Sequence, residues 1–462
     1  MKKFLKVFVF IMISVFVLAL GFVLITFPPV MTGMGAKTMC SCVFVTHRSP
    51  ESVLEKELRV FPGLTWSDIT VNKKDSSVTA TLLWNRSKAI FRKGLGCTLL
   101  YEKSEEAVRA QKINRPDLAP SVNQDTIPWP QGNKRDTIKL SGVNYTVLQN
   151  AVDEAFVDID PINPIHTHAV VVVYKGKLIA EKYAAGFDYN SRLMGWSMTK
   201  SIANALMGIL SKENKLDVDD PAPVQEWQED ERKKITINHL LNGTSGLAWS
   251  ESYFNPVAPF HQMFIRSDDK AAYAASLELE EQPGTFFEYS SANTNLLSRI
   301  IRHEVGNENY YRFPYEKLFH RIGMNNAIIE PDASGTFVLS SYCYASARDW
   351  ARFGLLYLND GVWNGERILP KGWIAYSTTP APPAPKQQYG AQIWLNLGNE
   401  NNPEDKEFTG LPNEAFLFEG FERNSVVIIP SKELVVVRLG VTHNKNFNHG
   451  NLINGVMAAL PQ

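Results

Sequence analysis

The sequence GWSMTKSIANALMGIL occupies residues 195–210 and predicts an amphipathic helix. Its apolar side chains recur at steps of three and four residues from Met198 onward, which places them on one face of a helix. Ser197 then lies in the first turn, and Lys200 lies one turn further along the same side. This spacing can bring a lysine nitrogen within hydrogen-bonding reach of a serine hydroxyl.

Ser197 and Lys200 are therefore candidates for acyl-transfer chemistry. A helix N-terminus offers free backbone N–H groups that stabilise developing negative charge, and a nearby lysine can serve as a base. The pattern Ser-x-x-Lys is weak by itself, because it occurs again at residues 267–270. The second copy lies among charged residues, which favours a solvated turn or the start of a helix.

The composition is that of a large globular protein. The chain has 462 residues, of which 44% are hydrophobic and 21% are charged. This length is enough for a large core and exceeds one ordinary small domain. The formal net charge is −1, so the overall charge gives no indication of a nucleic-acid partner.

The first 30 residues predict a membrane segment. Lys2 and Lys3 precede an uncharged apolar run from Val7 to Phe27, which is closer in length to a membrane span than to the core of a signal peptide. Basic residues before such a span stay in the cytoplasm. We therefore expect a retained signal anchor over residues 1–30, with a cleaved signal peptide as the alternative, and a domain on the periplasmic or extracellular side.

The cysteines fit an exported protein. Cys97 is predicted to form a disulfide with either Cys40 or Cys42, since oxidising compartments permit such bonds. Cys343 is expected to be a buried thiol. No cluster of histidines accompanies the cysteines, so a zinc site is not expected.

The rest of the chain divides into a β-rich section over residues 36–115, a linker over residues 116–134 and a large domain over residues 135–462. In the β-rich section, β-branched and aromatic runs predict short strands at residues 42–45, 78–84 and 97–101. Residues 52–58 predict a short helix. The linker is rich in proline and is expected to connect the domains or to lie extended over the second one.

Strong strands lie at both ends of the large domain. Residues 169–174 and 178–183 predict a hairpin before the serine helix, and residues 425–430 and 434–440 predict another near the C-terminus. We expect one antiparallel sheet built from both ends of the domain, with the helices inserted between them, which is an α+β fold. The serine follows a hairpin, and no Gly-x-Ser-x-Gly motif is present, which argues against an α/β-hydrolase.

Two further motifs follow the serine helix. Residues 235–247 predict a helix that is capped by Thr236 and ends in a glycine-rich turn, in which His239 is expected to pack or cap rather than react. Residues 283–293 begin with Pro-Gly, continue with aromatic residues and bring Tyr289 to the start of a helix. Without the other motifs, Tyr289 would be interpreted as a core tyrosine.

Together, these motifs resemble those of the serine β-lactamase and penicillin-binding-protein superfamily. The resemblance is closest to the class C β-lactamase-related branch, which also holds esterases, D-amino-acid peptidases and aminohexanoate-dimer hydrolases. Residues 197–200 match Ser-x-x-Lys, residues 240–247 resemble Leu-Leu-x-x-x-Ser-Gly-Leu, and residues 283–291 resemble Pro-Gly…Tyr-x-Asn. The resemblance runs from about Tyr145 to the C-terminus and implies an antiparallel sheet flanked by helices, with an additional helical subdomain.

The resemblance also implies roles for the three candidate residues. Ser197 would be the acylated nucleophile, and Lys200 would accept its proton. Tyr289 would share the proton relay and protonate the leaving group. The backbone N–H of Ser197 would form half of an oxyanion hole.

The sequence departs from the superfamily pattern at two places. Ser291 stands where many relatives have Asn, although Asn293 is nearby. Residues 416–424 contain neither the expected Lys-Thr-Gly nor its histidine-containing variant. The cation that would bind the carboxylate of a β-lactam is therefore missing, unless Arg423 replaces it.

We therefore expect a membrane-anchored, exported serine hydrolase that cleaves small esters or amides through an acyl-enzyme, without a metal or organic cofactor. Two alternatives stay open. The first is a catalytically silent relative that binds a cell-wall fragment or a partner protein. The second is a D-amino-acid peptidase or a β-lactamase.

Overall fold

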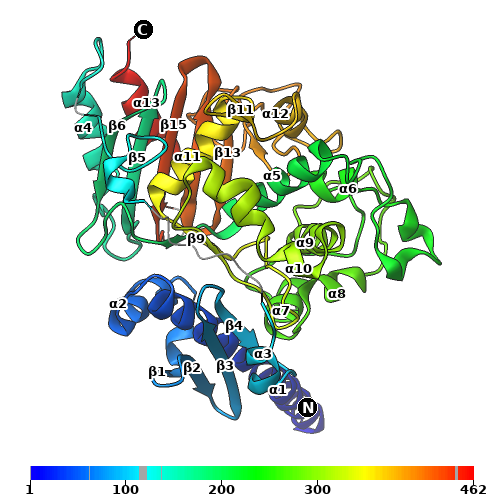
Figure 1. Ribbon diagram of the computed structural model, residues 1–462. Coiled ribbons are helices and arrows are strands. Elements are labelled where there is room, and N and C mark those ends of the chain that lie inside the picture. The colour runs from blue at the N-terminus through cyan, green and yellow to red at the C-terminus, as the bar shows by residue number, and fades with distance from the viewer. Residues whose placement is uncertain (1, 62, 114–121, 137, 443–445, 462) are drawn as a thin grey trace.

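The computed structural model describes residues 2–61, 63–113, 122–136, 138–442 and 446–461 (Figure 1). An N-terminal section lies below a larger domain that contains the central sheet and the helical subdomain (Figure 1). The N-terminal section comprises α1 (Lys2–Phe44), α2 (Pro50–Glu55), α3 (Glu105–Arg109), β1 (Asp68–Asn72), β2 (Ser77–Leu82), β3 (Asn85–Arg92) and β4 (Gly96–Leu100).

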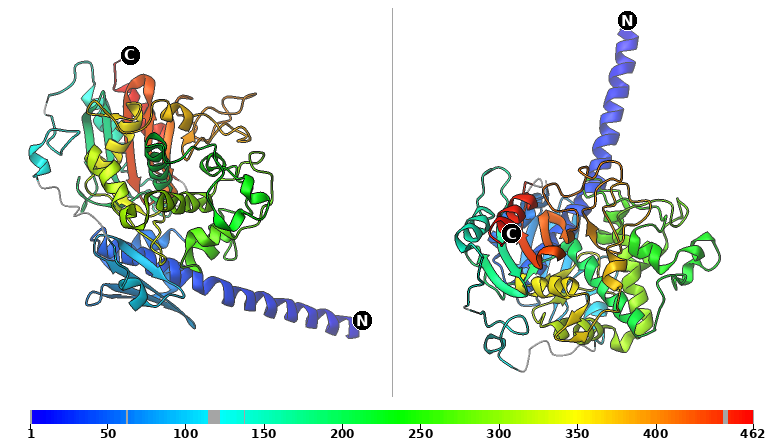
Figure 2. Two further views of the ribbon diagram at one scale, coloured as in Figure 1. Left: turned by 45° about the vertical axis from the view of Figure 1, so that its right-hand side comes forward. Right: turned by 90° about the horizontal axis from the view of Figure 1, so that it is seen from above.

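Helix α1 has two halves with different surroundings. Its apolar side chains from Phe4 to Ile25 are largely exposed, and this half projects away from the rest of the molecule (Figure 2). From Thr26 onward the helix is mostly buried and crosses the four-stranded antiparallel sheet β1-β2-β3-β4. By length and composition, the first half could cross a membrane.

One expectation for this region, a strand at residues 42–45, is wrong. Helix α1 continues beyond the predicted membrane segment, through Pro28 and Pro29 to Phe44. Residues 42–45 therefore do not form a strand, because residues up to Phe44 belong to α1. The physical reason is tertiary packing: the continued helix buries side chains such as Met39 against the sheet, which outweighs local preferences for proline turns and β-branched strands.

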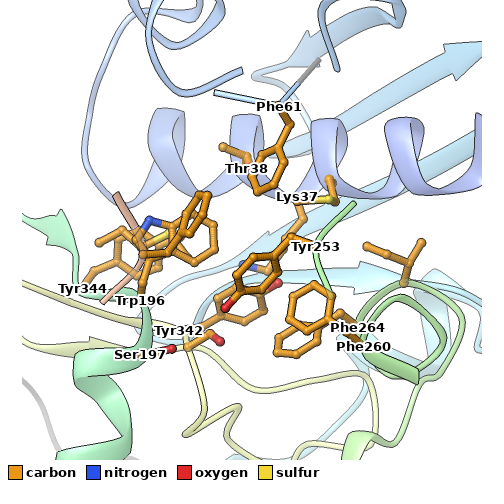
Figure 3. A pocket seen from close by; sticks show the side chains of 15 residues that line it. Lys37, Thr38, Phe61, Trp196, Ser197, Tyr253, Phe260, Phe264, Tyr342 and Tyr344 are labelled. Atoms are coloured by element: carbon orange, nitrogen blue, oxygen red, sulfur yellow. The ribbon is translucent and has the colours of Figure 1, made fainter. Parts of the chain in front are cut away.

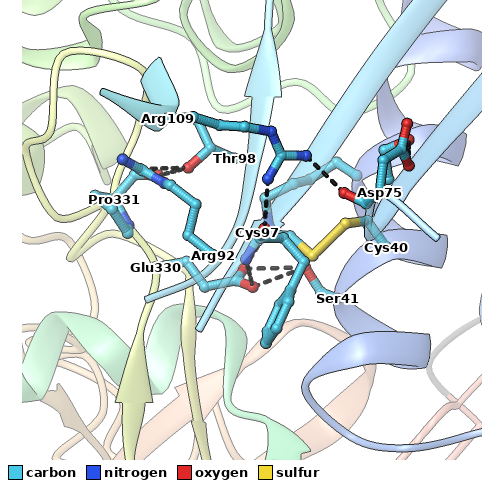
Figure 4. Close-up of a disulfide and its surroundings, with 12 residues drawn as sticks. Cys40, Ser41, Asp75, Arg92, Cys97, Thr98, Arg109, Glu330 and Pro331 are labelled. Atoms are coloured by element: carbon cyan, nitrogen blue, oxygen red, sulfur yellow. Dashed lines mark hydrogen bonds and ion pairs between the residues drawn. A yellow bond between two sulfur atoms is a disulfide. The ribbon is translucent and has the colours of Figure 1, made fainter. Parts of the chain in front are cut away.

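The disulfide joins Cys40 of α1 to Cys97 of β4, which resolves the choice between Cys40 and Cys42 (Figure 4). Next to it, Ser41 donates to Glu330, and the backbone N–H of Cys97 donates to the same carboxylate (Figure 4). Cys343 is a buried free thiol, as expected. The N-terminal section is thus fixed both within itself and to the larger domain.

The central sheet is built from both ends of the large domain, which confirms the predicted topology. Its six antiparallel strands lie in the order β12-β13-β14-β15-β5-β6. Their bounds are β12 (Trp394–Leu395), β13 (Phe416–Gly420), β14 (Asn424–Ile429), β15 (Leu434–Gly440), β5 (Thr167–Tyr174) and β6 (Lys177–Tyr183). Strand β15 pairs with β5, which joins the C-terminal hairpin to the hairpin that precedes the serine.

Both faces of this sheet are covered. Val170 and Val172 of β5 point to a cluster that includes the packed faces of α4 (Tyr145–Glu154) and α13 (His449–Ala458). Val171 and Val173 point to the opposite cluster, which includes α11 (Ala347–Leu358) and α5 (Thr199–Lys212). This alternation follows the two-residue period of a strand, and burial on both faces explains the unbroken valine run.

The remaining helices form the subdomain to the right of the sheet in Figure 1. They are α6 (Ile237–Asn242), α7 (Pro259–Ile265), α8 (Lys270–Ala275), α9 (Ser291–Val305), α10 (Asn307–Tyr310) and, nearer the sheet, α12 (Trp373–Ser377). Short strands complete the domain, namely β7 (Leu193–Met194), β8 (Ile328–Ile329), β9 (Cys343–Ala345), β10 (Val362–Trp363) and β11 (Glu366–Arg367). Thr236 caps α6 with the side chain of His239, so the predicted capping role of this histidine is confirmed.

The proline-rich segment over residues 116–134 was predicted as a linker or an extended covering, and its residues 116–121 lie outside the described residues. Its described part packs on the large domain. Trp129 is buried there and donates a hydrogen bond to the carbonyl of Gly176, while Arg352 donates to the carbonyls of Pro130 and Gly132.

Candidate active site

Ser197 sits on a tight connection between β7 and α5. The chain passes through a short 3₁₀ turn at Trp196–Met198, with Trp196 at φ +48°, before α5 begins at Thr199. Strand β13 ends against this turn, because a Cβ atom on Gly420 would lie 2.2 Å from the carbonyl oxygen of Gly195. The close approach of the two backbones requires glycine at position 420 and holds the end of β13 beside the serine.

Lys200 is buried one turn along from Ser197. Its Nζ donates to the Ser197 Oγ at 3.2 Å, to the Ser291 Oγ at 2.9 Å and to the carbonyl of Ser340 at 3.0 Å. Burial lowers the pKa of Lys200 to about 8, and the charge of Glu251 opposes this shift. A substantial fraction of the amine is therefore neutral near neutral pH, which is what a base requires.

Tyr289 reaches the same place from the loop before α9. The Lys200 Nζ lies 4.9 Å from the centre of the Tyr289 ring, and the Ser197 hydroxyl lies near enough to the phenol to lower its pKa slightly against the effect of burial. The rings of Tyr389 and Trp394 pack against Tyr289, with centroids 5.4 Å and 5.1 Å away. Burial raises the pKa of Tyr289 well above its usual value, so the phenol is a proton donor rather than a base at neutral pH.

The structure thus brings together all three candidates from the sequence, and it adds Glu251, which the sequence did not single out. The Ser291 hydroxyl accepts from Lys200 and donates to Glu251 at 2.5 Å. Glu251 also accepts from the backbone N–H of Ser291 and from the indole N–H of Trp249. This carboxylate lies in a loop between α6 and α7 and belongs to no motif that spacing could have revealed.

The two departures from the superfamily pattern have clear structural consequences. Ser291 occupies the middle of the Lys200–Glu251 hydrogen-bond chain, whereas Asn293 accepts from Ser245 in the glycine-rich turn. Arg423 lies 3.8 Å from the carboxylate of Glu419 and does not line the pocket at Ser197. The suggested replacement of the missing cation by Arg423 therefore has no support in the geometry.

The Ser197 side chain borders a narrow pocket lined mainly by aromatic rings (Figure 3). Lys37 is the only lysine or arginine among its described lining residues, and it is ion-paired with Glu330. Within the described ranges, no group of three or more His, Cys, Asp or Glu side chains is arranged to hold a metal ion.

Comparisons with known proteins identify relatives among hydrolases. A 6-aminohexanoate-dimer hydrolase of Paenarthrobacter ureafaciens is 28% identical over 224 residues, which are 45% of this chain and 56% of that protein. The match thus spans little more than half the length of that relative. The similarity to this relative supports the interpretation of the chain as a hydrolase.

Solved structures show the same fold. The structure of a putative 6-aminohexanoate-dimer hydrolase from Bacillus anthracis has a TM-score of 0.54 at 24% identity, covering 68% of this chain and 83% of that one. A family VIII carboxylesterase has a TM-score of 0.52 at 15% identity, covering 70% of this chain and 100% of that one. A family model described as Beta-lactamase matches residues 159–452, more than half of the chain, and the protein therefore belongs to the Beta-lactamase family.

Proposed function

We propose that the protein is a serine hydrolase that cleaves esters or amides through an acyl-enzyme on Ser197. The observation that carries this proposal is the convergence of the buried Lys200 amine and the Tyr289 side chain on Ser197, which itself lines a pocket. Each group has a protonation state that suits its role. The amine can be neutral, and the phenol keeps its proton.

In the first half of the reaction, Lys200 takes the proton of the Ser197 hydroxyl while the oxygen attacks the substrate carbonyl. The bond to the leaving alcohol or amine then breaks, and the leaving group takes a proton through Tyr289. The product is an ester between the acyl group and Ser197. In this mechanism the N–H of Ser197 would bind the oxyanion, and the end of β13, which packs against the carbonyl of Gly195, would supply a second backbone donor.

In the second half, water attacks the acyl-enzyme, Lys200 accepts a proton from the water, and the Ser197 oxygen recovers its proton. Glu251 contributes through Ser291, because its negative charge stabilises the protonated form of Lys200 as that form appears. The carboxylate is a positioning and electrostatic residue rather than a nucleophile, since the serine hydroxyl separates it from the lysine.

The two alternatives differ in what they require. A β-lactamase or a D-amino-acid peptidase would benefit from a free cation for a substrate carboxylate, and the described lining offers only the paired Lys37. A silent relative would retain the fold without turnover, and the altered residues 416–424 motivate this possibility. The shifted pKa of Lys200 favours the active enzyme over the silent relative.

We also propose that α1 anchors the protein with its catalytic domain outside the cytoplasm. Lys2, Lys3 and Lys6 flank the apolar half of α1 on its N-terminal side, which favours a cytoplasmic N-terminus. The Cys40–Cys97 disulfide suits an oxidising compartment. The second half of α1 carries this disulfide and is packed into the fold, which favours a retained helix.

A fluorophosphonate probe on the full-length protein in detergent tests the mechanism. We expect labelling of the wild type, loss of labelling in Ser197→Ala, and unchanged labelling in Ser267→Ala, the matched control from the second Ser-x-x-Lys. Equal labelling of wild type and Ser197→Ala would contradict the proposal. Hydrolysis of a panel of esters and amides that Lys200→Ala abolishes would exclude a silent relative, and rapid hydrolysis of a chromogenic cephalosporin would favour the β-lactamase alternative.

A further inference from the structure

The N-terminal section forms one wall of the pocket at Ser197. Met34, Lys37 and Thr38 of α1 line it together with Phe61, which follows α2 (Figure 3). The other walls come from the catalytic domain and include Phe260 and Phe264 of α7. A helix whose first half is suited to a membrane therefore becomes, about two to three turns after the start of its buried half at Thr26, part of the wall of the candidate active site.

The contact between α1 and α7 makes this wall a fixed part of the fold. A Cβ atom on Gly33 would lie 2.5 Å from the side chain of Ile265, so the two helices approach closely at this glycine. Lys37 is buried, pairs with Glu330 and lies over the ring of Tyr342 at 3.7 Å. These contacts hold the lining residues of α1 against the catalytic domain.

The chemistry of the lining is apolar. Phe421 at the end of β13 stacks on Phe61 with centroids 5.1 Å apart, and it meets Tyr253 at 5.1 Å and Trp196 at 5.5 Å. Tyr253 in turn meets Phe260 at 4.8 Å. These rings leave a cavity of only about 30 Å³, so an acyl chain would have to part them, and in doing so it would gain contact with aromatic surface.

The pocket also lies close to the level at which α1 would leave a membrane. Met34 follows Ile25, the last strongly exposed apolar residue of the projecting half, by nine residues, which is about 14 Å along a helix. Thr32 bonds to Ser87 of β3 at 2.8 Å, and the β2–β3 turn beyond Ser87 carries Leu83 and Trp84, both exposed. Exposed tryptophan near the end of a membrane span is typical of the interface.

From these observations we infer that the pocket takes the long acyl chain of a lipid ester, drawn from the leaflet on the side of the catalytic domain. This inference rests on the proposed function and names its substrate class. The Ser197 oxygen attacks the ester carbonyl, the lipid alcohol leaves with a proton, and water then releases the fatty acid as a carboxylic acid from the acyl-enzyme. No co-reactant other than water is needed.

Chain length provides the first test. Full-length protein in mixed micelles is given p-nitrophenyl butyrate and p-nitrophenyl decanoate at equal mole fractions, and Ser197→Ala defines the background. We expect kcat/KM for decanoate to exceed that for butyrate by about tenfold or more, because each buried methylene favours binding. Serine-dependent cleavage with no preference for decanoate would overturn the inference and leave the proposed hydrolase standing, whereas absence of serine-dependent cleavage and labelling would overturn both.

Two matched substitutions on α1 locate the effect. Met34 lines the pocket, whereas Met31 is a similarly half-buried methionine that packs near Gly63 and Trp66. We expect Met34→Trp to reduce decanoate cleavage about tenfold while butyrate cleavage changes less than about threefold. Met31→Trp should leave both rates within about threefold. Equal effects of the two substitutions on decanoate would contradict the proposed acyl path.

Thr38→Phe changes a residue of the same wall and repeats the test if Met34→Trp fails to fold. Thermal unfolding and fluorophosphonate labelling identify the folded variants.

A separate experiment tests whether the lipid substrate comes from the bilayer. The full chain is reconstituted into phosphatidylcholine vesicles that contain a fluorogenic phospholipid ester. We expect Ser197-dependent release of the fluorescent acid within these vesicles. Cleavage of micellar decanoate without any cleavage of the bilayer lipid would overturn the membrane source.

Discussion

Two segments of this chain share the pattern Ser-x-x-Lys and have different surroundings. In the first, Lys200 reaches the Ser197 hydroxyl and the Ser291 hydroxyl, and the nearest carboxylate, Glu251, lies behind Ser291. In the second, Lys270 reaches the backbone carbonyl of Ser267 rather than its hydroxyl.

The second segment is built as a helix start. Asp269 caps α8, and the Ser267 hydroxyl donates to the carbonyl of Asp269 at 2.8 Å. Of the two expected alternatives, a solvated turn or a helix start, the helix start is confirmed, and Lys270 is buried, with 5% of its surface exposed. Burial lowers its pKa as well, whereas the charges of Asp332 and Asp268 oppose that shift.

The comparison shows that a buried lysine three residues after a serine is not sufficient to make that serine a candidate nucleophile. The serine must be free to face a pocket, and the counter-charge must be weak or indirect enough to allow a neutral amine. Ser197 meets the first condition, and the single carboxylate behind Ser291 meets the second. Four predictions test this distinction, from the largest expected effect to the smallest.

The largest effect is expected from Lys200→Met. Removal of the general base should lower kcat/KM for any substrate of the wild type by about 1,000-fold, within the range of lost acid–base catalysis. Stopped assays with an ester substrate measure this loss, and circular dichroism confirms the fold. A loss smaller than about tenfold would mean that another group takes the proton of Ser197.

The next effect is the pH dependence of the wild type. Lys200 acts as a base only when neutral, so kcat/KM should rise as the pH rises through about 8 and level off above it. Between the plateau and pH 6 the neutral fraction falls about 100-fold, and the rate should fall with it. A substrate that does not ionise in this range is required, and a rate that is flat from pH 6 to 9 would contradict the assignment.

Glu251→Gln is expected to have an intermediate effect of a distinct kind. The charge of Glu251 raises the pKa of Lys200, so its removal should lower that pKa and shift the acid limb of the profile to lower pH. The plateau rate should fall about tenfold, because a charge-assisted hydrogen bond through Ser291 becomes a neutral one. A lowered plateau without any shift of the limb would indicate a purely structural role.

The sequence was sufficient for the parts of this site that depend on local periodicity. Ser197 in the 3₁₀ turn and Lys200 in the first turn of α5 are three residues apart along continuous helical backbone, so their proximity follows from local geometry. Tyr289 is far away in sequence, and it was found only because three weak motifs occur in the order of a known superfamily. The six-stranded sheet was predictable for a similar reason, because strong strand patterns stand at both ends of the domain.

What could not be predicted depends on contacts between distant segments. Glu251 has no distinctive neighbours in sequence, and its importance appears only when Ser291 lies between it and Lys200. The continuation of α1 beyond Pro28 depends on the surface of the β1–β4 sheet, which local propensity does not include. The contribution of α1 to the pocket could not be predicted for the same reason, because the sequence of residues 34–38 does not indicate which domain they contact.

The smallest effect on activity is expected from Lys270→Met, the counterpart of Lys200→Met in the second segment. Its kcat/KM should stay within about threefold of the wild type, because Lys270 does not contact Ser197 or line the pocket. Stability should nevertheless fall by about 3 kcal/mol, since the buried Asp332 loses the nearby charge that favours its ionised form. Chemical denaturation measures this loss, and Asp332→Asn combined with Lys270→Met should recover part of it. A large loss of activity in a folded Lys270→Met protein would show that the two copies are functionally coupled and would remove the contrast on which the assignment of Ser197 and Lys200 depends.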